Sequence, residues 1–209
     1  MKKKSSSKLW LKNHFKDFYV KKSHKKKIRS RAFFKIKQIN RKFNIIKIGY
    51  TVVDLGSSPG SWSQYVIKKI GSNGTLIACD IKYMEPIQKV KFIHGDIKKK
   101  ETYLLLLKLL NKKKVDLLMS DLSPKTTGHS LIDVCESINL SKIALNLSKK
   151  ILSKNGFFIT KLFQGEGYDI YIRSIKKIFF VVKIYKPSAS RLKSREIFVI
   201  AKNIKMINK

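Results

Sequence analysis

The sequence contains few of the residues that build disulfide scaffolds or metal sites. Its two cysteines, Cys79 and Cys135, lie far apart without CxxC spacing, which argues against a disulfide framework and against a zinc site. We expect both to be buried free thiols. The four histidines form no HxxxH pair that would place two ligands on one helix face. We therefore expect no protein-bound metal.

Long apolar runs are also missing. The best candidate, "LLLLKLL" at 104–110, contains a lysine and is shorter than the roughly 18 to 20 residues of a membrane helix, so we expect a core helix there. The basic start of the chain has no continuous apolar segment and no small-residue cleavage site. We expect a soluble, cytoplasmic protein without membrane contact, and 209 residues with 43% hydrophobic composition suffice for one globular domain.

Acidic residues are scarce, since 13 Asp and Glu stand against 47 Lys and Arg and give a formal charge of +34. Such a charge indicates a polyanionic partner, usually nucleic acid. Lysine is abundant everywhere, as a nucleotide bias would produce, so many lysines should be solvated surface. Arginine is more informative because only six occur and its planar side chain binds phosphate or carboxylate with two donors. We predict RNA contacts at the four arginines that fall in two short segments, Arg29, Arg31, Arg191 and Arg195.

The order of segments predicts a basic amino-terminal arm, residues 1–28, followed by a single domain over residues 29–209. The arm should hold one short helix near residues 9–20. Beyond residue 49, apolar runs alternate with helical stretches that open at Ser61 and near Leu131, which predicts an α/β fold with a mostly parallel sheet. Two final runs without a helix between them predict an antiparallel hairpin at one sheet edge. The expected strands are 50–56, 75–81, 90–96, 115–123, 156–163, 179–186 and 195–203.

A helix is also expected before the first strand. In "SRAFFKIKQINRKF", Ala32, Ile36, Ile39 and Phe43 recur at helical spacing and define a buried stripe. Lys35 falls at the edge of that stripe. Taken alone, a lysine in this position is more often a solvated helix flank than a functional group.

The segment "VVDLGSSPGSWSQYV" has the order strand, glycine turn, helix. Gly56 and Gly60 allow a tight turn and close approach of a ligand, but the spacing does not match GxGxxG, and Pro59 cannot donate an amide to a pyrophosphate. S-adenosylmethionine has no phosphate and carries a cationic sulfonium. A turn that follows an acid, Asp54, therefore suits it better than a dinucleotide.

Further cofactor contacts are expected where the next strands end, because ligands of such sheets bind beyond the carboxyl ends of the strands. Asp80 is placed to hold ribose hydroxyls, and Asp96 could accept from an adenine amino group. Trp62 packs either beside the ligand or in the core, and the sequence leaves the two open.

Four further segments, "RSRAFFK", "MSDLSP", "TKLFQGEG" and "SRLKSREIFVIA", occur in this order around the glycine turn. Together they resemble the FtsJ/RrmJ family of 2′-O-ribose methyltransferases from about Trp10 to Ala201. The resemblance implies a Rossmann-like fold with a seven-stranded, mostly parallel sheet and helices on both faces. It also implies a Lys-Asp-Lys-Glu tetrad, which falls on Lys35, Asp121, Lys161 and Glu196. The family's cofactor contacts fall on Gly60, Trp62, Asp80, Asp96 and Asp121.

The likeness is strongest to the bacterial members that act on a uridine of 23S rRNA in the large ribosomal subunit. It implies methyl transfer from S-adenosylmethionine by a monomer without an obligate protein partner. Lys161 would orient the attacking hydroxyl and take its proton late, while its charge at that moment stays open. Glu166 in "FQGEG" is read as a loop or helix-start residue. The polar, basic loop "SPKTTGHS" departs from the family and leaves substrate contacts open.

Three other functions remain as alternatives. The same chemistry could act on tRNA or on an mRNA cap, although the short chain favours rRNA. The protein could instead be an RNA-binding ribosome-assembly factor with little activity, which the intact tetrad disfavours. A dehydrogenase is weaker still because of the Pro59 turn.

Overall fold

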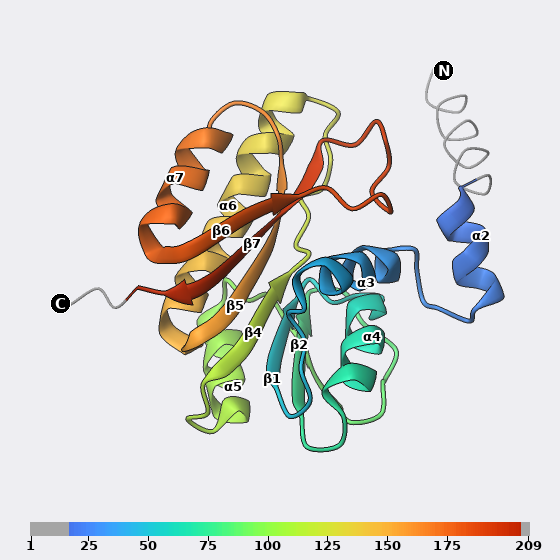
Figure 1. Cartoon of the computed structure of the whole chain (residues 1–209), viewed down its shortest axis with the longest axis vertical. Helices are drawn as coiled ribbons and strands as arrows, with labels where there is room; N and C mark the ends of the chain where they lie inside the picture. Colours follow the sequence, from blue (N-terminus) through green and yellow to red (C-terminus); the bar gives the residue numbers. More distant parts are fainter. Residues whose placement is uncertain (1–16, 206–209) are drawn as a thin grey trace.

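The computed structural model describes residues 17–205, which form a seven-stranded sheet with helices on both faces (Figure 1). The strand order is β3-β2-β1-β4-β5-β7-β6. The first five strands are parallel, and β7 pairs antiparallel with both β5 and β6. The strands are β1 (Thr51–Leu55), β2 (Thr75–Asp80), β3 (Val90–His94), β4 (Val115–Ser120), β5 (Leu152–Phe163), β6 (Phe179–Tyr185) and β7 (Glu196–Ile204).

Six helices connect or precede these strands within residues 17–205. They are α2 (Phe18–Lys25), α3 (Ala32–Phe43), α4 (Ser61–Ile70), α5 (Lys100–Leu110), α6 (Ser130–Ile151) and α7 (Tyr168–Ile178). The predicted fold class is thus confirmed, and so is the carboxyl-terminal hairpin. In that hairpin β7 lies inside the sheet and β6 forms its edge.

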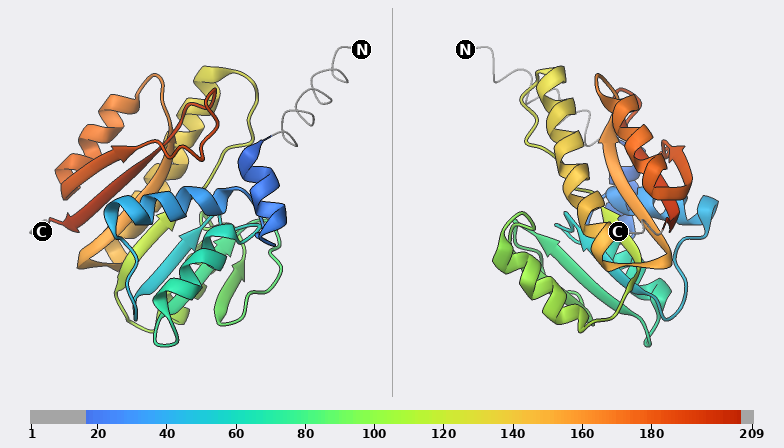
Figure 2. Two further views of the ribbon diagram at one scale, coloured as in Figure 1. Left: turned by 45° about the vertical axis from the view of Figure 1, so that its right-hand side comes forward. Right: turned by 90° about the vertical axis from the view of Figure 1, so that its left-hand side faces the viewer.

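Alternating side chains of the central strands build two separate cores. Val52 of β1 faces α3 and α4, where Ile36, Ile39 and Val66 are buried with it. The next residue, Val53, points to the opposite face, which is covered by α5, α6 and α7. Figure 2 shows the two helical layers on either side of the sheet. Because both faces are covered, all five residues of β1 are buried, as expected for a central parallel strand.

Several expectations meet a different local structure. Cys79 is buried as expected, but Cys135 is exposed because it lies on the outer side of α6. The 104–110 segment is part of α5, yet only one side of it reaches the core: Leu106 is buried whereas Leu104 is half exposed. No helix among residues 17–205 is long and apolar enough to cross a bilayer.

The predicted arm is described only in part, because residues 1–16 lie outside the described residues and include most of its expected helix. Within the remainder, Asp17 caps α2 by accepting from the backbone amides of Tyr19 and Val20. Tyr19 packs against Phe34 with ring centroids 5.2 Å apart. The end of the predicted arm therefore docks on α3.

Candidate active site

The glycine turn after β1 presses against the segment that follows β4. Gly56 has a φ of +73°, and a Cβ at this residue would lie 2.8 Å from the backbone nitrogen of Leu122. Gly60 has a φ of +100°, and its Cβ would lie 2.8 Å from a guanidinium nitrogen of Arg29 and 2.9 Å from the sulfur of Met84. Gly56 is required because a side chain would meet backbone atoms, whereas Gly60 is favoured by its left-handed backbone, since the atoms near it are the ends of flexible side chains.

Two acids lie where the neighbouring strands end. The carboxylate of Asp80 accepts from the amide of Ser58 at 2.9 Å and from the amide of Lys82 at 2.8 Å. That of Asp96 accepts from the amide of Lys98 at 2.9 Å. Both acids line a cavity of about 110 Å³ beside Leu122. Carboxylates held in this way suit the hydroxyl and amino groups of a nucleoside, so they fit the adenosine part of S-adenosylmethionine.

Asp54 lies deeper, inside β1, and is fully buried. One carboxylate oxygen accepts from the Ser63 hydroxyl at 2.7 Å, while the other has no hydrogen-bond partner. Burial raises the pKa of Asp54 to about 7, against the lowering effect of the Ser63 hydrogen bond. The buried hydroxyl oxygen of Ser57 also has no partner. Buried polar atoms normally have partners, so this pair of oxygens is consistent with a polar ligand at the turn.

Trp62 occupies the core, one of the two positions that the sequence left open. Its side chain is buried among the residues that pack α3 and α4 on the sheet. The indole N–H donates to the carbonyl of Ala32 at 3.0 Å, and the ring lies 5.6 Å from that of Phe198. Any cofactor contact at this residue would therefore come from its backbone.

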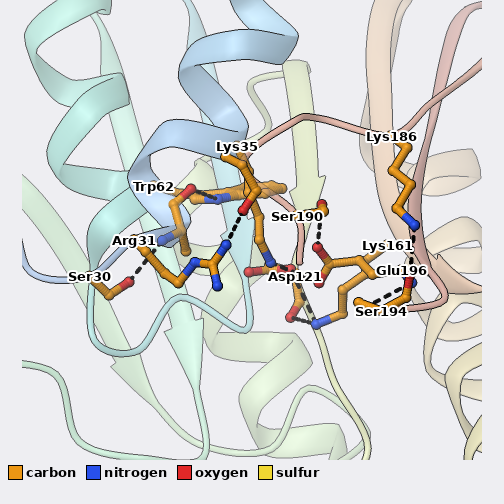
Figure 3. Close-up of polar contacts among 12 residues, drawn as sticks. Ser30, Arg31, Lys35, Trp62, Asp121, Lys161, Lys186, Ser190, Ser194 and Glu196 are labelled. Carbon is orange, nitrogen blue, oxygen red and sulfur yellow. Dashed lines mark hydrogen bonds and ion pairs between the residues drawn. The ribbon is translucent and has the colours of Figure 1, made fainter. Parts of the chain in front are cut away.

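The four predicted tetrad residues form two ion pairs (Figure 3). Lys161 projects from β5 with its side chain only 5% exposed, and its ammonium group lies 3.2 Å from the Asp121 carboxylate. It also donates to the Asp121 backbone carbonyl at 2.8 Å. Asp121 directly follows β4, so one short segment supplies both acceptors.

The second pair joins α3 to the start of β7. The ammonium group of Lys35 donates to Glu196 at 2.7 Å, and it lies 5.7 Å from the ring centroid of Phe198. Phe198 is the register partner of Lys161 across β5 and β7. Phe198 is therefore a neighbour of both lysines.

Glu196 has a further partner that no sequence pattern indicates. Ser190, which is buried, donates to the other Glu196 oxygen at 2.8 Å. Lys186 donates to the carbonyl of Ser194 at 2.7 Å, and the Ser194 hydroxyl accepts from the amide of Glu196 at 3.1 Å. The turn before β7 is thus held at several points. A serine six residues before an acid has no recognisable pattern, so only the folded loop reveals its role.

The four predicted RNA-binding arginines differ in their surroundings. Arg29 donates to three backbone carbonyls, those of Pro59, Glu85 and Pro86. Arg31 pairs with Asp17 and donates to the Ala189 carbonyl, and burial lowers its pKa from the usual value even though Asp17 opposes this. Both guanidinium groups are thus held by acceptors of the protein itself.

Arg191 and Arg195 line cavities beside the tetrad. Arg191 borders a cavity of about 240 Å³ together with Arg31, Lys35, Ser194 and Glu196. Arg195 borders another of about 280 Å³, which Ser194 also lines.

Glu166 is not part of the two ion pairs. Glu166 is exposed in the turn before α7. In the described part of the chain, no three His, Cys, Asp or Glu side chains lie close enough together to hold a metal ion.

Comparisons with known proteins agree with this architecture. A model of the FtsJ-like methyltransferase family matches residues 28–204. Two proteins named Ribosomal RNA large subunit methyltransferase E are 47% and 48% identical to the chain. The first, from Buchnera aphidicola subsp. Cinara cedri, aligns over 96% of both chains. The second, from Buchnera aphidicola subsp. Baizongia pistaciae, aligns over 98% of this chain and 99% of its own.

Solved structures show the same fold. A Plasmodium falciparum protein described as a putative ribosomal RNA methyltransferase superposes with a TM-score of 0.77 at 29% identity, over 84% of this chain and 98% of its own. Human methyltransferase-like protein 13, solved with SAH, has a TM-score of 0.54 at 14% identity over 77% of this chain and 74% of its own, and it supports the fold alone. The family match covers most of the chain and the two relatives cover nearly all of it, so the chain belongs to the FtsJ-like methyltransferase family.

Proposed function

We propose that this protein transfers a methyl group from S-adenosylmethionine to the 2′-hydroxyl of a uridine ribose in 23S rRNA of the large ribosomal subunit. The observation that carries this proposal is Lys161, an almost fully buried lysine held by Asp121 beside the Lys35–Glu196 pair. The names of the two relatives point to the same substrate class. We further propose that the protein acts as a monomer in the cytoplasm, without an obligate protein partner.

The residues around the glycine turn fit the cofactor. Asp80 and Asp96 line one cavity where β2 and β3 end, and the Gly56 turn leaves no side chain between that region and Leu122. Asp54 and Ser57 offer unpartnered oxygens beside the turn, and Asp121 connects the turn to the tetrad. When bound, S-adenosylmethionine supplies an electrophilic methyl group on a sulfonium.

The tetrad would position the attacking hydroxyl. For proton transfer Lys161 must be neutral: its two N–H groups can then donate to the carbonyl and the carboxylate of Asp121, which leaves its lone pair to accept the hydroxyl of the ribose. Holding oxygen, methyl carbon and sulfur in line lowers the barrier by removing orientational freedom. With S-adenosylmethionine bound, its methyl group would pass to O2′ and leave a neutral thioether, and the lone pair of neutral Lys161 would take the hydroxyl proton. A positioned base of this kind contributes roughly 10² to 10⁴ in rate.

Glu196 positions Lys35 and does not act directly on Lys161. Its two oxygens are taken by Lys35 and Ser190, so it holds Lys35 at the mouth of the site and does not pair with Lys161. The Lys35 ammonium then faces the cavity that Arg191 also lines. Cations there suit the phosphates next to the target ribose, contacts that position the RNA without reading its sequence.

The test is transfer of labelled methyl groups to undermodified large subunits, naked rRNA, tRNA and capped mRNA in parallel, with mapping of the modified atom. We expect label on a uridine 2′-oxygen of 23S rRNA. Lys161→Ala should abolish it, while Lys183→Ala, an exposed lysine on β6, should not. Label on tRNA or cap alone would replace the substrate assignment, and no label anywhere would favour an assembly factor. Near-normal turnover by folded Lys161→Ala would contradict the mechanism.

A further inference from the structure

The cavity that Arg195 lines has no part in the chemistry described so far. It measures about 280 Å³ and lies between the 126–134 segment and the ends of β5 and the turn before β7. Phe163 and Val134 give it an apolar wall, and Thr126, Ser130 and Arg195 contribute polar groups. Small-molecule sites usually span about 300 to 1,000 Å³, so this cavity suits a small group better than a large ligand.

Its place relative to the tetrad follows from the strands. Phe163 lies two residues beyond Lys161 on β5 and is the register partner of Glu196. Ser194 lines this cavity and also the cation-lined cavity of Lys35, Arg31 and Arg191. The two cavities therefore share Ser194, and Phe163 links the first of them to the strand that carries Lys161.

A nucleotide has three parts that could use these features: a base, a ribose and phosphates. The base is attached to the ribose carbon next to the one that carries the 2′-hydroxyl, and the phosphates leave the sugar elsewhere. Because Lys161 is only 5% exposed, a ribose can reach it only by entering the cleft. A base still stacked in a helix cannot follow its ribose there, and enzymes with buried sites extrude the target nucleotide.

We propose that the Phe163 cavity receives the base of the target nucleotide after it leaves the RNA stack. This inference rests on the proposed function. Phe163 offers an aromatic surface against which a base can pack. The exposed rim is ordered by Asp133, whose carboxylate accepts from the amide of Thr127 at 2.8 Å and from its hydroxyl at 3.0 Å. The backbone hydrogen bond from Thr127 lowers the pKa of Asp133, which keeps that anchor ionised.

The loop supplies a matched pair of variants. Thr126→Trp places a large ring at the cavity, whereas His129→Trp adds the same ring to an exposed residue of the same loop that does not line it. With undermodified subunits, we expect Thr126→Trp to raise KM for the subunit at least tenfold over His129→Trp. Affinity for S-adenosylmethionine, measured by calorimetry, should be equal in both. Equal KM values for the two variants would overturn the proposal.

Wild-type protein on undermodified subunits is the control for the proposed function. Failure of the proposed function looks different from equal KM values, because the wild-type protein would then leave the subunits without label on any ribose.

Discussion

Replacing Asp54 with asparagine should change how the protein's stability depends on pH. Asp54 is fully buried, receives one hydrogen bond from Ser63, and has one oxygen without a partner. Burial raises its pKa in the folded protein to about 7, while an aspartate in an unfolded chain titrates near about 3.9. Between these two values the folded state holds a proton that the unfolded state has released.

The sign follows from this difference in bound protons. Stability rises with pH where the unfolded state binds more protons, and here the folded state binds more. The contribution of Asp54 to the free energy of unfolding therefore falls as the pH rises from about 4 to about 7, and the loss is complete above the folded pKa. A displacement of about three pH units at about 1.36 kcal/mol each corresponds to about 4 kcal/mol. The asparagine side chain of the Asp54→Asn variant cannot ionise and should avoid this loss.

The assay is urea unfolding of wild type and Asp54→Asn at pH values from about 4 to about 9. We expect the difference in unfolding free energy to shift in favour of Asp54→Asn by about 4 kcal/mol across that range and to level off above about pH 8. Ser63→Ala should extend the slope to higher pH, because the Ser63 hydrogen bond is the first effect opposing burial. A difference that stays constant from acid to alkaline pH would refute the reasoning.

Three further predictions concern the site. Ser190→Ala should lower kcat by about tenfold or more, because a hydrogen bond to a charged group typically contributes about 1.5 to 3 kcal/mol. Ser188→Ala changes the same loop away from Glu196 and should leave kcat unchanged. Steady-state kinetics of both variants separates a local effect from loosening of the loop. Gly56→Ala should lower the melting temperature or abolish cofactor binding, since its Cβ would lie within 2.8 Å of the Leu122 backbone; scanning calorimetry with and without S-adenosylmethionine decides this, and wild-type behaviour would contradict the packing argument. Affinity for large-subunit rRNA should fall steeply with salt because the contacts are to phosphates. A protein that contacts six to ten phosphates loses about 10³ to 10⁵ in affinity between about 50 and 200 mM salt. Filter binding that shows the same affinity across this range would contradict the prediction.

Much of the fold could be predicted because each strand carries its signal locally. The runs ending at Leu55, Asp80 and Ser120 are short and apolar, and their order with the helices dictates a parallel sheet whose carboxyl ends converge. That convergence alone predicts that Asp80, Asp96, Asp121 and Lys161 lie near one another. Lys35 and Glu196 could be added only by family resemblance, because neither residue has a local pattern that distinguishes it from a surface charge.

The remaining features depend on contacts between distant segments. The pairing within the tetrad is one example, since Lys161 binds Asp121 while Glu196 binds Lys35 and Ser190. The partners of Glu196 are fixed by how α3 and the turn before β7 meet across 161 residues of sequence. Sequence spacing contains no information on such distances.

The arginines show what a composition argument can and cannot identify. In a chain where lysine is the common cation, an arginine indicates a place that needs several directional donors. Arg29 is an example, because its guanidinium group joins the glycine turn at Pro59 to the segment of Glu85 and Pro86. A lysine ammonium group could make these contacts only with less defined geometry. The acceptors that the structure shows are backbone carbonyls of the protein, however. Residue type therefore identifies the geometry of an interaction, whereas the identity of the acceptor depends on the fold. We expect Arg29→Lys to loosen the glycine turn before it affects the affinity for RNA.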